Sequence, residues 1–412
     1  SRTIEKQMLF FALKGNNVDG NLFADNAVKK GGIAIIDDPQ YKKNDNYILV
    51  NDVFETLTEL ARFHRKKLKA NVLAITGTNG KTTTKELVYN VLSTHYKVHA
   101  TKGNLNNHIG VPITILQTPF DTEWLIVEMG ANHKGEIEYL CNIAQPNYAI
   151  ITNIGIAHLE GFGNLENIFL TKAELYDYIK IYGKQIFVNA DDQKLFASAK
   201  DYTNYTYSVQ NGNVVGKIID NESPMQIQWQ HNNNIFLTKS HLFGSYNLYN
   251  ILAAIAIGTC TGVPYDKINS AIEAYIPKNN RSQTIKTNKN NIIILDAYNA
   301  NPSSMKLAIN DFLQLKDANK LLILGSMLEL GKYSEEKHIE IIKLLTEQDV
   351  KHCIFVGTEF YKLKSKYNHS GYTFYQNIVE TIKHIEKNII KNTTILVKGS
   401  RGIALEKTIT YL

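Results

Sequence analysis

The sequence is poor in cysteine and in long apolar runs. Its three cysteines among 412 residues, Cys141, Cys260 and Cys353, lie far apart and lack the spacing of a metal site. We interpret each as a small buried apolar residue in a reducing compartment. No apolar run reaches 18 residues and no secretory leader opens the chain, so we expect a cytoplasmic protein without a membrane partner. Because the chain begins at Ser1 rather than at methionine, we expect its N-terminal part to be shortened.

The chain also lacks a concentration of charge of one sign. Its formal net charge is +6 and its lysines are spread along the sequence, so nucleic acid is not an expected partner. We find no internal repeat and no long low-complexity tract. A hydrophobic content of 44% and a charged content of 20% are typical of a globular protein, and this length predicts two to four domains.

Apolar segments of strand length alternate with helical patterns, which predicts an α/β protein with mostly parallel sheets. A basic stretch at 64–69 and Pro277 mark boundaries that predict three domains, 1–68, 69–278 and 279–412. Helices are expected at about 52–67 and 246–261, and antiparallel β-structure over 203–240. Residues 1 to about 50 are expected to form short α/β structure, with segments at 8–13 and 32–36. The expected strands are Val72–Thr76, Trp124–Glu128, Tyr148–Asn153, Gln185–Asn189, Ile292–Asp296, Leu321–Leu324, Ile354–Val356 and Ile395–Val397.

A glycine-bearing loop follows the strand at 72–76 and leads into a helical pattern. Strand, loop, Gly-Lys-Thr and helix form the arrangement that binds nucleotide phosphates, with Lys81 on the outer phosphates and Thr82 on Mg²⁺. The common pattern has a glycine where this chain has Ile75, and here only two residues separate Gly77 from Gly80. The alternative is a tight strand-to-helix turn. A lysine at the start of a helix opposes the helix dipole, however, and this favours the phosphate hypothesis.

Polar residues also follow the next strands. Glu128 ends the strand at 124–128, where a carboxylate beside a phosphate loop is a natural Mg²⁺ ligand, although an acid at a strand end can simply be exposed. His158 comes shortly after the strand at 148–153 and is a candidate second metal ligand or a structural histidine. For Lys172, on a predicted helix, the sequence itself favours a solvated lysine.

Two further regions carry polar clusters. The asparagine-rich run at 101–110 suits a peptide or carboxylate ligand, but it is equally compatible with an ordinary turn. In the last third of the chain, polar segments at 296–302, 324–331 and 398–401 each follow an apolar strand. They predict a site at the edge of that domain that faces the nucleotide, and Asp296 is placed to take a ribose hydroxyl.

Taken together, these segments resemble the Mur ligase family over nearly the whole chain. The resemblance begins at Ser1-Arg2 and at 10–15 with Asp19-Gly20, includes Gly77–Thr82, and ends at Lys398–Arg401. It implies a UDP-binding N-terminal domain, a central ATPase domain and a Rossmann-like C-terminal domain. The segments 101–112, 296–305 and 328–331 with His338 are similar to the branch that adds D-alanyl-D-alanine to a UDP-N-acetylmuramoyl-tripeptide. The chain departs from the family at Ser326, where an aspartate is usual.

The resemblance also implies roles for individual residues. Lys81 would contact ATP, Thr82 and Glu128 would hold one Mg²⁺, His158 would hold a second, and Lys172 would be carbamylated and bridge the two ions. These four catalytic candidates are Lys81, Lys172, His158 and Glu128. The implied nucleotide contacts are Gly77, Thr78, Asn79, Gly80, Lys81, Thr82, Thr83, Asn247, Arg281 and Asp296. The implied substrate contacts are Ser1, Arg2, Lys14, Thr101, Asn104, Asn106, Asn107, Asn299, Asn301 and Lys398.

The activity that follows from the resemblance is ATP-dependent amide ligation through an acyl phosphate in peptidoglycan precursor synthesis, by a protein expected to be a monomer. Two alternatives stay open. One is another Mur-type ligase, either a sister that adds a different amino acid or a folate polyglutamate synthetase. The other is a nucleotide-binding module without ligase activity. The segment Asp296–Pro302 argues against the first, and the set Glu128, His158 and Lys172 argues against the second.

Overall fold

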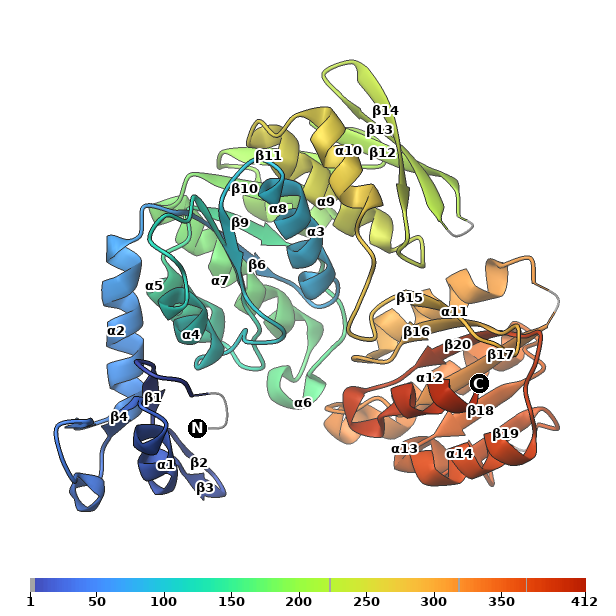
Figure 1. Cartoon of the computed structure of the whole chain (residues 1–412). Helices are drawn as coiled ribbons and strands as arrows, with labels where there is room; N and C mark the ends of the chain where they lie inside the picture. The colour runs from blue at the N-terminus through green and yellow to red at the C-terminus, as the bar shows by residue number, and fades with distance from the viewer. Residues whose placement is uncertain (1–3, 222–223, 318, 368) are drawn as a thin grey trace.

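The computed structural model describes residues 4–221, 224–317, 319–367 and 369–412 (Figure 1). Ser1 and Arg2, two of the predicted substrate contacts, lie outside the described residues. Within the described part, a three-stranded, a nine-stranded and a six-stranded sheet follow one another along the chain, besides a two-stranded hairpin. Figure 1 shows these three α/β parts as the blue, the cyan-to-yellow and the orange-to-red regions. The predicted α/β class is confirmed.

The N-terminal part is built on three parallel strands, β1 (Leu9–Phe11), β4 (Ile33–Ile36) and β5 (Tyr47–Leu49). The hairpin β2 (Lys14–Gly15) and β3 (Val18–Asp19) turns at Asn16-Asn17, and α1 (Ala24–Lys29) precedes β4. Helix α2 (Val53–Lys67) begins at Asp52, whose carboxylate accepts the Glu55 N–H. Near its end, Arg65 donates to the carbonyl oxygen of Ala144 at 2.7 Å, so α2 joins this part to the central one.

The central sheet has the order β14-β13-β12-β11-β10-β9-β6-β8-β7. Its strands are β6 (Asn71–Thr76), β7 (Val98–Ala100), β8 (Trp124–Glu128), β9 (Tyr148–Ile151), β10 (Gln185–Asn189), β11 (Asn204–Ser208), β12 (Val214–Asp220), β13 (Met225–His231) and β14 (Asn234–Ser240). The prediction of antiparallel structure over 203–240 was wrong for its first strand, since β11 pairs in parallel with both β10 and β12. Helix α8 (Gln193–Ala199) forms the crossover that a parallel β10–β11 pair requires.

Helices cover both faces of this sheet and enclose two apolar cores. The first core includes residues of α5 (Glu136–Ala144), α7 (Leu165–Tyr182) and α8, and α4 (Gly110–Leu116) contributes to the same layer. The second lies under α3 (Lys81–Ser93), α9 (Asn247–Cys260) and α10 (Tyr265–Glu273). Helix α9 is buried over most of its length, as its alanine- and isoleucine-rich sequence predicts. The short helix α6 (Leu159–Phe162) lies at the edge of the sheet nearest the C-terminal part (Figure 1).

The C-terminal sheet has the order β15-β16-β20-β17-β18-β19 and is parallel except for β15. The strands are β15 (Gln283–Lys286), β16 (Ile292–Asp296), β17 (Lys320–Gly325), β18 (Cys353–Val356), β19 (Tyr372–Tyr375) and β20 (Thr394–Lys398). Its helices are α11 (Pro302–Gln314), α12 (Ser334–Glu347), α13 (Thr358–Tyr361) and α14 (Ile378–Lys387). Asn301 and Ser304 form a capping box at the start of α11, with Pro302 in the first turn.

This architecture brings several strand ends to one edge. The strands β6, β8 and β9 are parallel neighbours, so the residues that follow them meet at their carboxyl ends, where α/β proteins bind ligands. Among the described residues, no helix combines the length and the apolar character needed to cross a bilayer.

Candidate functional site

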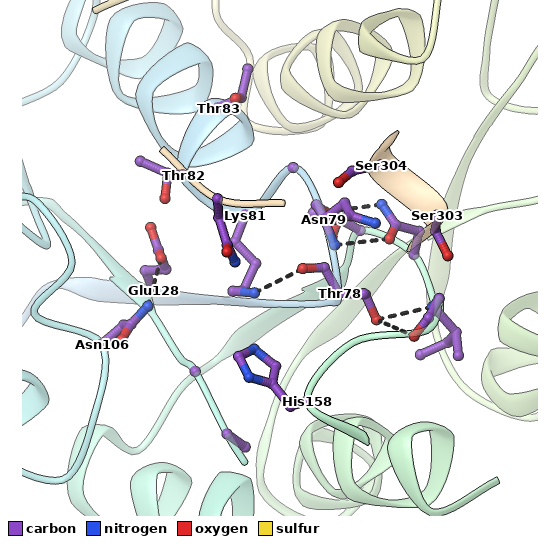
Figure 2. A pocket seen from close by; sticks show the side chains of 18 of the residues that line it. Thr78, Asn79, Lys81, Thr82, Thr83, Asn106, Glu128, His158, Ser303 and Ser304 are labelled. Carbon is purple, nitrogen blue, oxygen red and sulfur yellow. Dashed lines mark hydrogen bonds between the residues drawn. The ribbon is translucent and has the colours of Figure 1, made fainter. Parts of the chain in front are cut away.

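A cavity of about 1060 Å³ lies between the central and C-terminal parts, at the carboxyl ends of β6, β8 and β9. The phosphate-loop residues 78–83 form one wall, and Figure 2 shows Lys81, Glu128, Asn106 and His158 around it. The C-terminal part contributes Asp296, Glu329 and Lys398 to the lining. The cavity is therefore assembled from two domains, and neither forms it alone.

The loop before α3 explains the unusual glycine spacing. Gly77 has a φ of 142° and Gly80 a φ of 79°, backbone conformations that residues with a side chain rarely adopt. A Cβ at Gly80 would lie 2.4 Å from Asn250 Oδ1, and one at Gly77 would lie 2.0 Å from Thr152 Oγ1. Both positions therefore require glycine for space as well as for conformation. The two glycines at 77 and 80 thus provide the conformations that this loop needs, and the glycine of the common pattern is not required at position 75.

Lys81 folds back over this loop. Its Nζ donates to the carbonyl oxygens of Gly77 at 2.7 Å and Thr78 at 3.2 Å (Figure 2). Burial lowers the pKa of the Lys81 ammonium, the Glu128 carboxylate opposes that shift, and the Arg281 charge adds to it. An anion in the cavity would relieve the unfavourable burial of this cation, so the loop favours a phosphate ligand.

Glu128 ends β8, and its two carboxylate oxygens lie in different surroundings. Its Oε1 accepts the side-chain N–H of Asn106 at 2.8 Å, while its buried Oε2 has no hydrogen-bond partner among the described residues. Such an orphaned carboxylate oxygen suits a hard cation. The described residues contain no group of three or more His, Cys, Asp or Glu side chains suited to a metal. A Mg²⁺ ion here would therefore need further oxygen ligands, such as the Thr82 hydroxyl, water and phosphate.

His158 lies close to the loop in Figure 2 and meets a residue of the C-terminal part. It has a left-handed φ of 50°, and its Nδ1 lies 2.5 Å from Glu329 Oε2. Burial lowers the pKa of the His158 imidazole, the Glu329 carboxylate opposes this, and the charges of Lys81 and Lys172 lower it further. A neutral imidazole is the form that ligates a metal.

Lys172 is buried, so the prediction of a solvated lysine from the sequence itself was wrong. It lies on α7 with 3% of the residue exposed, and its Nζ is 5.7 Å from the centroid of the Phe162 ring. Burial, reinforced by the charge of Lys81 and opposed by that of Glu174, lowers the pKa of Lys172 to about 7. A large share of its amine is therefore neutral and nucleophilic at neutral pH.

The C-terminal part contacts the phosphate loop directly. Asn301 donates to Asn79 Oδ1 at 2.8 Å, and Ser303 accepts the Ile156 N–H at 3.1 Å. Lys398 pairs with Asp296 at the ends of the neighbouring strands β20 and β16. The contacts of Asn301 and Ser303 hold the C-terminal part against the nucleotide side of the central one.

Arg281 lies near the junction of the two parts with its guanidinium stacked on an aromatic ring. Its Cζ is 3.7 Å from the centroid of the Tyr298 ring, and its buried Nε has no hydrogen-bond partner among the described residues. The stacked cation lines the cavity and is positioned to meet an anion.

Comparison with known proteins agrees with this geometry. Three family models match the chain in succession: Mur ligase family, catalytic domain, over residues 1–75; Mur ligase middle domain over 75–258; and Mur ligase, glutamate ligase domain, over 280–401. The UDP-N-acetylmuramoyl-tripeptide–D-alanyl-D-alanine ligase of Bacillus subtilis is 34% identical, with 100% of this chain and 92% of that protein covered. The chain belongs to the Mur ligase family.

Solved structures resemble this Mur ligase over its whole length. MurF from Acinetobacter baumannii matches with a TM-score of 0.87 and 29% identity, covering 99% of this chain and 91% of that one. MurF from Thermotoga maritima in complex with ADP matches with a TM-score of 0.86 and 27% identity, covering 100% of this chain and 95% of that one. The three-part α/β architecture is thus that of the family.

The structure of this Mur ligase brings most predicted site residues to the cavity. Those that line it are Thr78, Asn79, Gly80, Lys81, Thr82, Thr83, Asn104, Asn106, Asn107, Glu128, His158, Asn247, Arg281, Asp296, Asn299 and Lys398. Gly77, Thr101, Lys172 and Asn301 lie behind its wall, in contact with or close to lining residues. Lys14 lies elsewhere, in the N-terminal hairpin, where it pairs with Asp37 at 2.9 Å.

Sequence reasoning missed several residues that complete the site. Glu329 pairs with His158, and Asn153 accepts the Asn79 N–H at 3.0 Å and donates to the Asn79 carbonyl at 2.9 Å. Asn153 carried a usable signal, because it is a polar residue shortly after a buried strand. Glu329 was covered only by the expected polar segment 324–331, and its pairing with His158 could not be predicted, since the two residues belong to different domains.

Proposed function

We propose that this Mur ligase joins D-alanyl-D-alanine to the peptide carboxylate of a UDP-N-acetylmuramoyl-tripeptide while ATP is converted to ADP and phosphate. The observation that carries the proposal is a single cavity shared by a phosphate loop, an amide-rich loop and a carboxylate oxygen with no hydrogen-bond partner among the described residues. The Bacillus subtilis relative, matched over the full chain, is named for this activity. The product would be the complete peptide of a peptidoglycan precursor.

The nucleotide would lie along the phosphate loop. Lys81, together with the N–H groups at the start of α3, would contact the phosphates, and Arg281 would approach them from the domain junction. Asn247 and Asp296 would hold the nucleoside. ADP in the similar Thermotoga maritima structure supports ATP as the cosubstrate.

The residues present fit bound Mg²⁺. Thr82 and Glu128 would hold one ion, and His158 with a carbamylated Lys172 would hold a second. A carbamate forms when a neutral amine takes up CO₂ and releases a proton, and the low pKa of Lys172 supports that step. When bound, the ions would neutralise charge between the phosphates and the attacking carboxylate.

In the first step, a carboxylate oxygen of the tripeptide attacks the γ-phosphorus, which forms an acyl phosphate and releases ADP. In the second, the amine of D-alanyl-D-alanine attacks the acyl carbon, and phosphate leaves from the tetrahedral intermediate. Lys81 stabilises the charge that moves between the phosphates, and no side-chain nucleophile is needed. Asn104, Asn106 and Asn107 would orient the peptide with amide donors and acceptors, with Thr101, Asn299, Asn301 and Lys398 beside them.

We propose that each of the three domains has the binding role that the resemblance implies. Residues 1–68 would bind the UDP moiety with Lys14, Ser1 and Arg2, residues 69–278 would bind ATP, and residues 279–412 would close over it. The enzyme would act as a monomer in the cytoplasm, without nucleic acid or membrane partners.

The experiment that tests the proposal supplies ATP, Mg²⁺, D-alanyl-D-alanine and a UDP-N-acetylmuramoyl-tripeptide, and detects the pentapeptide product by mass. Separate reactions with lysine and diaminopimelate tripeptides identify the preferred third residue. Ligation of glutamate to a folate, or of a single amino acid to a shorter UDP-peptide, would replace the proposal with a sister activity. Nucleotide binding without any ligated product would leave only a binding module.

Gly80→Ala is expected to lower the affinity for ADP by at least about tenfold, since roughly 1.4 kcal/mol of clash and strain suffices for that loss. The added Cβ would lie 2.4 Å from Asn250 Oδ1 in a left-handed conformation. Calorimetric titration with ADP measures the effect. The control is Gly262→Ala, which has a similar φ of 82° but no heavy atom within 4 Å of its Cβ among the described residues. Equal affinities for both variants would contradict the prediction.

A further inference from the structure

Lys85 is a buried cation on α3, one helical turn after Lys81. Only 1% of its side chain is exposed. Its Nζ donates to the carbonyl oxygens of Thr101 at 2.7 Å and Gly103 at 3.3 Å. A buried ammonium is costly unless charge and hydrogen bonds compensate it, so this environment is built around the charge.

Two carboxylates face this ammonium. Glu86 Oε1 lies at 3.0 Å on the exposed side of the helix, and Glu128 Oε2 lies at 3.9 Å on the cavity side. The second distance exceeds that of a hydrogen bond but leaves a strong attraction between buried charges. Lys85 therefore attracts the Glu128 carboxylate without occupying the oxygen that has no hydrogen-bond partner among the described residues.

The same lysine supports the asparagine-rich loop. Thr101 accepts the Glu128 N–H on its Oγ1 at 3.0 Å, and the Asn106 carbonyl oxygen accepts the Gly130 N–H at 2.8 Å. Asn106 in turn donates to Glu128 Oε1. Loop and carboxylate are thus linked to each other, and Lys85 is the group that links both to the phosphate-loop helix.

We propose that Lys85 is a positioning residue that aims Glu128 Oε2 at a divalent cation and holds the loop 101–107 against the bound peptide. The inference rests on the proposed function for the peptide, but its effect on cation binding can be measured separately. Lys85 lies behind Glu128 and Thr101, so it acts through these residues rather than on the reacting atoms.

Two variants remove the charge in different ways. Lys85→Met keeps the length of the side chain without any donor, and Lys85→Gln keeps a donor for the Thr101 or Gly103 carbonyl. We expect both to weaken Mn²⁺ binding to the ADP complex by about tenfold, measured by electron paramagnetic resonance, and to raise KM for the UDP-tripeptide by a similar factor. The affinity for ADP without metal is expected to stay within about twofold of the wild type, because Lys81 and the loop are untouched. Lys85→Arg, which keeps the charge, should recover part of the Mn²⁺ affinity.

The matched control is Lys320→Met. Lys320 donates to the carbonyl oxygens of Leu313, at 2.7 Å, and of Leu315, and among the described residues it forms no ion pair with a carboxylate. This control is expected to leave Mn²⁺ affinity and KM unchanged even if its unfolding temperature falls. Unchanged Mn²⁺ affinity in both Lys85 variants would overturn the proposal. A loss of ADP affinity without metal as large as the loss of Mn²⁺ affinity would also overturn it. A wild type that binds Mn²⁺·ADP but makes no pentapeptide would refute the proposed function. The Mn²⁺ affinities of the wild type and the Lys85 variants would still test the positioning role of Lys85.

Discussion

Lys81→Ala is expected to abolish ADP release in the presence of the UDP-tripeptide and D-alanyl-D-alanine, with a fall in kcat of at least about 10²-fold. The Lys81 ammonium is the cation of the phosphate loop, and in this structure only the Gly77 and Thr78 carbonyl oxygens accept its hydrogen bonds among the described residues. Once ATP binds, the same three N–H groups can turn to phosphate oxygens. Without them, the charge that develops on the leaving ADP in the proposed reaction would lack the stabilisation that this ammonium supplies.

The measurement is a coupled assay of ADP release with all three substrates present. Lys81→Arg keeps the charge but not the compact geometry, and we expect it to fall between alanine and wild type. Lys217→Ala, on the distant strand β12, is the control for the loss of a lysine as such. Thermal unfolding shows whether each variant is folded. Turnover of a folded Lys81→Ala protein near that of the wild type would refute the assignment of the loop.

The part of the site built on the central sheet could be predicted from the sequence. Strand, loop and helix around Lys81 are local features, and parallel strands place the residues that follow them at one edge. From the sequence, Glu128 and His158 are therefore expected near the loop. The strands β7, β15 and β19 were missed because they are short and their sequences contain polar residues, so they show no clear apolar run.

Contacts between domains could not be predicted in the same way. The pairing of His158 with Glu329, and of Asn79 with Asn301, joins residues that lie far apart in the sequence. Their meeting depends on how the two domains are placed, which no local pattern encodes. Lys85 and Lys172 share a different difficulty. A lysine on a helix is usually solvated, and only the packing around it shows that it is buried.

Lys172→Met is expected to abolish ligation and, at the same time, to stabilise the metal-free protein at pH 7 in buffer depleted of CO₂. Lys172 has a pKa of about 7 when folded, against 10.5 when unfolded. The unfolded chain therefore binds more protons between these values, and the stability of the wild type rises with pH across that window. The destabilisation of the folded state by the buried Lys172 ammonium is fully present below pH 7 and disappears above pH 10.5. Its size is on the order of 5 kcal/mol.

Denaturant unfolding at pH 7 and at pH 10 measures this difference. The free energy of unfolding of Lys172→Met should exceed that of the wild type at pH 7, and the gap should narrow at pH 10. Lys180→Met on the same helix is the matched control, since among the described residues Lys180 makes only an exposed pair with Asp177 at 3.4 Å, and such pairs contribute less than about 1 kcal/mol. A wild type more stable than Lys172→Met at pH 7 would contradict the burial argument.

The role of the buried lysine in catalysis has its own test. Lys172→Ala leaves space where a carbamate would reach the second Mg²⁺, and a short carboxylic acid such as acetate can supply the missing oxygen ligands. We expect partial recovery of pentapeptide synthesis with acetate, and none in Lys81→Ala, where no carboxylate has been lost. Full activity of Lys172→Ala without any acid would exclude the carbamate. The expected gain in stability of Lys172→Met and the expected loss of activity in Lys172→Ala have one physical cause. The burial that destabilises the Lys172 ammonium also keeps its amine neutral, the form that would react with CO₂.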